Sequence, residues 1–276
     1  MKTSLVVTMI FLAASSTLVY AQEIELRISG GYAYGIGGSV LRAYEAYTAN
    51  GATVVQGTND EYFSAGQGAR FSGGAVIYIY DNFGIFVQSS YTAADEEVSP
   101  LIPFSGLQSG VTRRSESTKS RSVSGEAGVH IQLKQDFISP YCGVGAGVFY
   151  STGLTIGLEI VDNNHSVTEQ EYTVSTPIGF VGYIGAGVRI SEAILLTVEA
   201  KTVAASFHAS ELEYTKYNID GVDRLGELST RIKKRTFEED KNYTLSNDMN
   251  TPSFGGPPPP IPLSSLAITI GFSIQL

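Results

Sequence analysis

The sequence predicts an all-β fold, namely an eight-stranded antiparallel up-and-down transmembrane β-barrel with four long extracellular loops and three short periplasmic turns. The first observation behind it is that eight segments alternate large apolar residues with small or polar ones, the period of a strand with one apolar face. The second is that the connections are long after the first, third, fifth and seventh segments and short after the others. All long loops therefore lie at one end, as in membrane barrels.

The segment that comes first in the chain, residues 1–21, has the pattern of a secretory signal peptide. Lys2 precedes a mostly apolar run, residues 5–19, and Val19-Tyr20-Ala21 suits the signal peptidase. We expect a mature barrel domain at 22–276. Loss of Lys2 changes the formal charge from -9 to -10, which argues against a nucleic-acid partner.

The first four strands are expected at residues 24–35, 66–80, 83–94 and 121–134. In the first of them Ile24, Leu26 and Ile28 share one face, and Glu25 and Arg27 share the other. A minimal turn at residues 81–82 joins the second strand to the third. The segment at 39–49, inside the first long loop, is expected to be a helical turn or an irregular loop.

The last four strands are expected at residues 139–151, 177–190, 194–206 and 266–276. The fifth strand continues through 154–161, turns, and returns at 171–175, which predicts a hairpin that projects beyond the membrane. In the closing strand every second residue is apolar, from Leu266 to Leu276. The four long loops fall at about 36–65, 95–120, 152–176 and 207–263.

Strand length and glycine content agree with a barrel. Strands of roughly 11 to 13 residues at about 3.3 Å each, tilted about 40°, reach about 25–30 Å, the height of the apolar band of such barrels. The uncharged run at 137–158 is long enough for a membrane helix, but Pro140 and its glycines suit a strand better.

Three segments of the chain resemble those of a known family. The segments are Tyr80-Asp-Asn-Phe-Gly-Ile85, Ser139-Pro-Tyr-Cys-Gly-Val-Gly-Ala-Gly-Val148 and Gly182-Tyr-Ile-Gly-Ala-Gly-Val188. They resemble segments of the small outer-membrane barrels that include the OmpA transmembrane domain, OmpW-like and opacity-type proteins. The resemblance covers the strands and not the loops. It implies the bacterial outer membrane and assembly by the barrel-assembly machinery, and it implies no particular activity.

The polar faces of the strands carry charged side chains that would point into a narrow lumen. We expect them to form an ion-pair and hydrogen-bond network that fills the barrel, because unpaired buried charges are costly. A gated polar path for solutes is the alternative. The candidate residues are Glu25, Arg27, Arg70, Glu126, His130, Arg189, Glu199 and Lys201.

Enzymatic and metal chemistry have weak support in the sequence. His130, Ser124 and Glu126 are the types of residue that a hydrolase uses, but their spacing on one strand suits a shared face and not a contact between nucleophile and base. Three histidines without ligand spacing predict no metal site. The glycine runs lack the spacing of nucleotide-binding motifs, so we expect no cofactor.

One basic run, Arg231-Ile-Lys-Lys-Arg235, lies in the fourth loop. The simpler interpretation is a solvated strand neutralised by Glu238, Glu239 and Asp240. The alternative is contact with lipopolysaccharide phosphates or another anionic partner.

The most economical function is non-enzymatic: envelope structure, or surface interaction through the long loops with an extracellular ligand. Passage or binding of small or hydrophobic solutes is the runner-up. A soluble lipid-binding calycin barrel is disfavoured, because its loops would not segregate to one end. Outer-membrane lipids and lipopolysaccharide are the expected surroundings.

Overall fold

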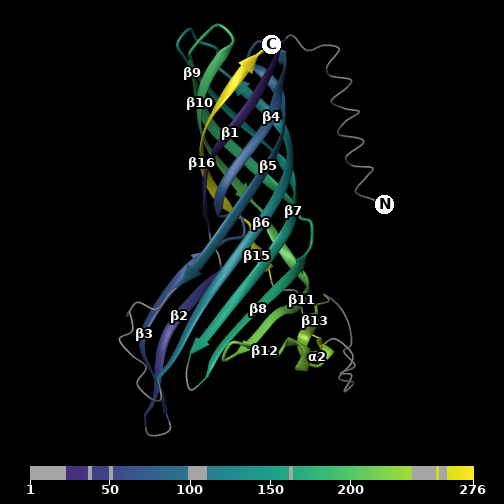
Figure 1. Ribbon diagram of the computed structural model, residues 1–276. Coiled ribbons are helices and arrows are strands. Elements are labelled where there is room, and N and C mark those ends of the chain that lie inside the picture. Colours follow the sequence, from purple (N-terminus) through teal and green to yellow (C-terminus); the bar gives the residue numbers. More distant parts are fainter. Residues whose placement is uncertain are drawn as a thin grey trace.

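The computed structural model describes residues 23–36, 39–49, 52–98, 111–161, 164–237, 253–254 and 260–276 (Figure 1). The expected signal peptide, and the acidic residues expected to neutralise the basic run, lie outside the described residues.

Eight strands close into an antiparallel barrel, which confirms the predicted fold class. Each strand pairs with its neighbour along the chain, and the last pairs with the first, with Ala33 opposite Ala267. The barrel strands are β1 (Glu23–Gly35), β4 (Gly68–Tyr80), β5 (Phe83–Val98), β6 (Val111–Gln132), β7 (Ile138–Val161), β9 (Ile178–Arg189), β10 (Ile194–Ala204) and β16 (Ser265–Gln275).

The outside of the barrel is apolar. Along β16 buried and exposed residues alternate strictly, and Ile268, Ile270 and Phe272 are among the exposed ones. On β9, Ile178 and Phe180 are 78% and 77% exposed. Such a surface is unfavourable in water and favourable in lipid, and every backbone group of a closed barrel is paired within the sheet.

The two ends of the barrel differ. The short turns after β4, β6 and β9 lie together with the C-terminus at the upper end of Figure 1, and the long connections lie at the lower end. This agrees with the predicted asymmetry between turns and loops.

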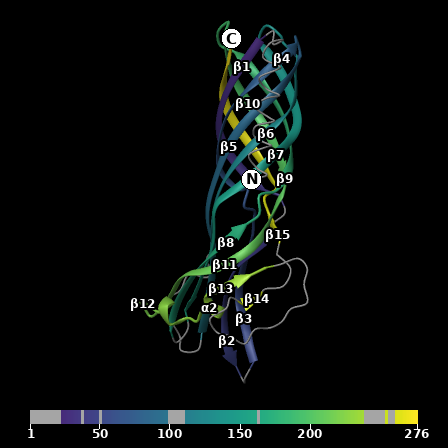
Figure 2. The same cartoon turned by 90° about the vertical axis from the view of Figure 1, so that its right-hand side faces the viewer.

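At the loop end the barrel sheet continues into further strands, which the sequence analysis did not predict in full. Strands β5, β6 and β7 run past the barrel, and β7 continues into the predicted hairpin with β8 (His165–Val174). Strand β11 (Ser206–Ile219) then pairs with β8, and Figure 2 shows the two crossing the lower part of the molecule together. We call this loop-end part of the sheet the extension.

The segment at 39–49 is a strand, which corrects the expected helical turn or irregular loop. Strand β2 (Ser39–Ala49) pairs with β3 (Ala52–Phe63) over its full length, and also with residues 111–114 of β6. Backbone pairing to these two partners decides its conformation. The loops expected at 36–65 and 95–120 are therefore partly strand.

The fourth connection contains short elements. They are β12 (Val222–Asp223), a 3₁₀ turn (Leu225–Glu227), α2 (Thr230–Lys233), β13 (Lys234–Thr236), β14 (Ser253–Phe254) and β15 (Pro260–Pro262). Within the described ranges, no helix has the length and apolar character needed to cross a membrane.

An apolar cluster lies where the barrel meets the extension. Phe207, from the start of β11, is fully buried there, and Ile261 of β15 pairs with it across the strand ladder. Ala65, Leu154 and Leu263 are buried in the same cluster. The same cluster also contains Tyr78, Phe86, Tyr141 and Tyr183, so buried packing continues from the barrel interior to this junction.

Candidate functional site

A charged cluster occupies the middle of the lumen. Glu126 of β6 accepts a hydrogen bond from Arg70 Nη2 of β4 at 2.8 Å, and its other carboxylate oxygen contacts Lys201 Nζ of β10. Ser124 Oγ donates to Glu126 at 2.7 Å. Arg70, Glu126 and Lys201 are 3%, 2% and 1% exposed. Glu199 lies two residues before Lys201 on the same face of β10, so two carboxylates face two cations.

A second cluster lies nearer the short turns. Arg27 Nε donates to Glu25 at 2.7 Å, and the hydroxyl of Tyr78 donates to the other carboxylate oxygen at 2.8 Å. Arg27 Nη2 lies 3.2 Å from His130 Nε2, and His130 Nδ1 lies 2.9 Å from the Tyr183 hydroxyl. Because a guanidinium can only donate, Nε2 must accept, and Nδ1 then carries the proton and donates to Tyr183.

Glycines on two neighbouring strands make room for the rings in this cluster. The ring of Tyr183 on β9 lies directly over Gly143 on β7, and the ring of Tyr141 on β7 lies over Gly185 on β9. A methyl group at either glycine would overlap the facing ring. The guanidinium carbon of Arg27 also lies 4.4 Å from the centre of the Tyr141 ring, a cation–π contact.

Arg189, the remaining lumen candidate, lies apart from these clusters. It is near the end of β9, and its guanidinium donates to the backbone oxygen of Glu192 in the following turn at 3.0 Å. The structure therefore places Glu25, Arg27 and His130 in one cluster and Arg70, Glu126, Glu199 and Lys201 around the other, with Arg189 at the turn end.

Of the three residues that could suggest a hydrolase, Ser124 and Glu126 contact each other, but His130 has other partners. Ser124 donates to Glu126, whereas His130 contacts Tyr183 and Arg27. His165 is exposed and lies 2.6 Å from Glu159. Among the described residues no group of three or more metal-ligand types could hold an ion.

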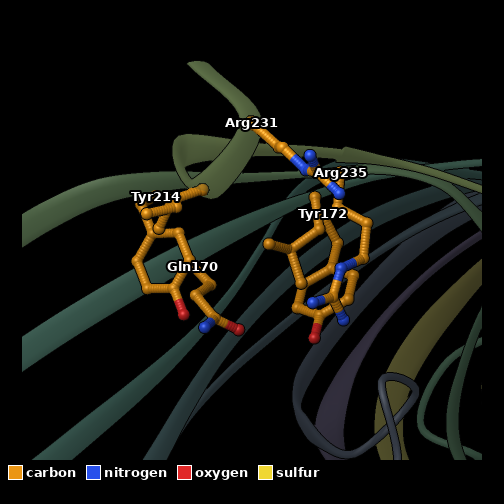
Figure 3. A pocket seen from close by; sticks show the side chains of 7 residues that line it. Gln170, Tyr172, Tyr214, Arg231 and Arg235 are labelled. Atoms are coloured by element: carbon orange, nitrogen blue, oxygen red, sulfur yellow. The ribbon is translucent and has the colours of Figure 1, made fainter. Parts of the chain in front are cut away.

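A pocket of about 480 Å³ lies in the extension (Figure 3). Its lining comes from β8, β11 and the predicted basic run. Figure 3 shows Arg235 and Tyr172 on one side, and Tyr214 and Gln170 on the other, with Arg231 above. The lining residues are Gln170, Tyr172, Leu212, Tyr214, Arg231, Ile232 and Arg235.

The lysines and the arginines of the basic run have different surroundings. Lys234 Nζ lies 2.7 Å from a carboxylate oxygen of Glu211, and Lys233 Nζ lies 3.9 Å from one of Glu213. The hydrogen bond to Glu211 raises the pKa of Lys234. Arg231 and Arg235 line the pocket instead.

The sequence did not indicate that tyrosines line this pocket, because Tyr172 and Tyr214 come from distant segments. Burial raises the pKa of Tyr172, and the nearby charge of Arg235 opposes that shift. The tyrosine is therefore neutral at physiological pH.

The closed ring of eight strands, the apolar exterior and the filled polar interior define the class: the protein is a small β-barrel of the outer-membrane type. No protein-family model matches the sequence, and no curated protein matches it.

Solved structures of other outer-membrane proteins are similar to the chain. Ail, the attachment invasion locus protein of Yersinia pestis, has 8% identity and a TM-score of 0.32, and the match covers 92% of this chain and 100% of Ail. Ail in complex with the heparin analogue sucrose octasulfate gives 9% identity, a TM-score of 0.33 and the same coverage. The outer membrane protease OmpT from Escherichia coli gives 8% and 0.29, over 93% of this chain and 97% of OmpT.

Proposed function

We propose that the protein is a non-enzymatic outer-membrane anchor that presents its extension to the outside of the cell for surface interaction. The barrel is embedded in outer-membrane lipid and lipopolysaccharide after insertion by the barrel-assembly machinery. The extension, and not the lumen, carries the interaction with an extracellular ligand.

The filled lumen is the observation that carries this proposal. From the short turns toward the loops, the interior holds the Tyr78–His130 cluster, then the Arg70–Glu126 cluster, then the apolar cluster around Phe207. Each layer contains side chains that are almost completely buried. A narrow barrel packed in this way supports a structural anchor over a path for solutes.

Planar-bilayer recordings test the closed lumen. We expect no stable conductance steps from the purified barrel at any voltage or pH in the range where it stays folded. Reproducible single-channel steps that change with Glu126→Gln would contradict the anchor and favour solute passage.

Lipid A mass in cells expressing His130→Ala should equal that in cells expressing the wild-type protein, because His130 has structural partners.

The surface role has its own test. Protease added to intact cells should cut the fourth connection, within residues 207–263, while the barrel fragments stay in the membrane. Full protection of that connection on intact cells, together with cleavage in lysed cells, would place the extension on the wrong side of the membrane.

A further inference from the structure

We propose that the extension pocket binds a compact anionic sugar, that is, a hexose-sized ring bearing a sulfate or phosphate group. This inference rests on the proposed surface role and names the chemistry of the ligand. In the bound state the anionic group lies between Arg231 and Arg235, and the sugar ring lies against Tyr172 and Tyr214.

The alternation of side chains along the strands places the pocket residues on one face of the extension. Leu212 on β11 pairs with Tyr172 on β8 and with Arg235 on β13, so a single row across three strands carries pocket residues. The next row on the same face pairs Tyr214 with Gln170.

The carboxylates of these strands belong to the opposite face. They are Glu169, Glu171, Glu211 and Glu213. The described lining of the pocket accordingly contains two cations and no carboxylate, although the whole chain has 27 acidic and 18 basic residues. An anion in the pocket is therefore separated from the acidic face by the sheet itself.

The two arginines line the pocket, whereas the two lysines between them do not. Lys233 and Lys234 have glutamate partners, whereas Arg231 and Arg235 form no ion pair with any residue that the structure describes. A guanidinium offers a planar fork of donors that fits two oxygens of a sulfate or phosphate group. Two such forks on one rim can bind a tetrahedral anion together.

The rest of the lining fits a ring with hydroxyl groups. The tyrosine faces and Leu212 offer apolar area to the C–H face of a sugar, while the two phenols and the Gln170 amide can donate to and accept from its hydroxyls. A volume of about 480 Å³ falls within the range of about 300–1,000 Å³ of small-ligand pockets.

The overall charge favours a small ligand over a long polyanion. A formal charge of -9 for the full chain repels an extended anionic polymer, whereas a single anionic group meets mainly the two arginines. Binding of this kind weakens as salt is raised.

Isothermal titration calorimetry on the full-length protein in detergent tests the site. The probes are glucose 6-sulfate and glucose 6-phosphate, with glucose and inorganic sulfate as single-feature comparisons. We expect saturable binding of one or both esters, and at least about tenfold weaker binding of either comparison probe, because each lacks half of the contacts. A separate titration with lipopolysaccharide micelles shows whether the sugar phosphates of the cell's own surface can fill the pocket.

Matched variants locate the binding. Arg235→Gln should weaken ester binding at least about tenfold, whereas Arg224→Gln, which removes the same charge from an exposed pair with Glu227 outside the pocket, should leave it within about twofold. Tyr214→Ala should weaken the esters more than inorganic sulfate.

Two results would overturn the site: neither ester binding more tightly than inorganic sulfate, or unchanged ester binding by Arg235→Gln. Protease cutting on intact cells reports the surface role independently. If cutting is normal and ester binding is absent, the pocket inference fails and the proposed function stands.

Discussion

At the residue scale, Glu126 connects three strands of the barrel through contacts across the lumen. One buried carboxylate contacts an arginine from β4 and a lysine from β10, strands that do not neighbour β6 in the ring. It therefore ties three sectors of the wall across the lumen. Removing one partner of a buried ion pair leaves an uncompensated charge, which costs more than the intact pair contributes.

Glu126→Gln should lower the free energy of unfolding by about 3–5 kcal/mol. Urea titration in detergent, followed by heat-modifiable gel migration, measures the loss. The control is Glu159→Gln, which changes an exposed pair and should cost about 0–1 kcal/mol. If the double variant Glu126→Gln, Lys201→Met loses the full sum of the two single losses, the ion pair is not coupled as described.

Gly143→Ala should destabilise the barrel by about 1–3 kcal/mol, because the new methyl group overlaps the ring of Tyr183. The same unfolding assay applies. Gly125→Ala is the matched control on β6, since nothing lies within 4 Å of its added methyl group. Equal stability of the two variants would show that the Tyr183 ring does not occupy that place.

At the element scale, the strands in lipid were predictable and those beyond it were much less so. The barrel strands need one apolar face, which leaves a period of two in the sequence. The stretch of β6 before Arg121 has no apolar alternation in its sequence, which includes Thr112, Arg113 and Ser115, and it still pairs with β7. Its strand structure depends on β5 and β7, which is information that a local pattern does not contain.

Strand β2 illustrates the same point. Its alanines and glutamate favour a helix locally, and pairing with β3 and β6 overrides that preference.

Only part of the pocket lining could be predicted from the sequence, for a similar reason. The basic run marked Arg231 and Arg235, but the tyrosines meet them only through the pairing of β8, β11 and β13.

Turns at the two ends of the molecule should differ in whether an inserted epitope is labelled by antibody on intact cells. The turn between β11 and β12 has Asp220 and Gly221 with φ of 51° and 78°, a tight hairpin turn open to solvent. An epitope inserted between these residues should be labelled by antibody on intact cells. An epitope between Asp81 and Asn82, at the opposite end, should be labelled only after permeabilisation. Labelling of both on intact cells would contradict the assigned topology.

At the scale of the whole molecule, the exposed apolar exterior determines how the protein behaves in solution. We expect it to fractionate with outer membranes, to need detergent for extraction, and to migrate faster on a gel before heating than after. Protein that stays monomeric and soluble in plain buffer would contradict the membrane barrel. Washing membranes with high salt is the control, because it removes proteins held only by charge.

Strand β7 passes from the barrel into the extension as one element of 24 residues, and β6 accompanies it for 22. At about 3.3 Å per residue and a tilt of about 40°, the longer strand rises roughly 60 Å, about twice the height of the apolar band. The two strands share one hydrogen-bonded ladder from the barrel into the extension, with a single register shift between Arg121 and Ser122. A ligand bound to the extension is therefore connected to the barrel wall through backbone hydrogen bonds, and a force on it is transmitted to the barrel strands.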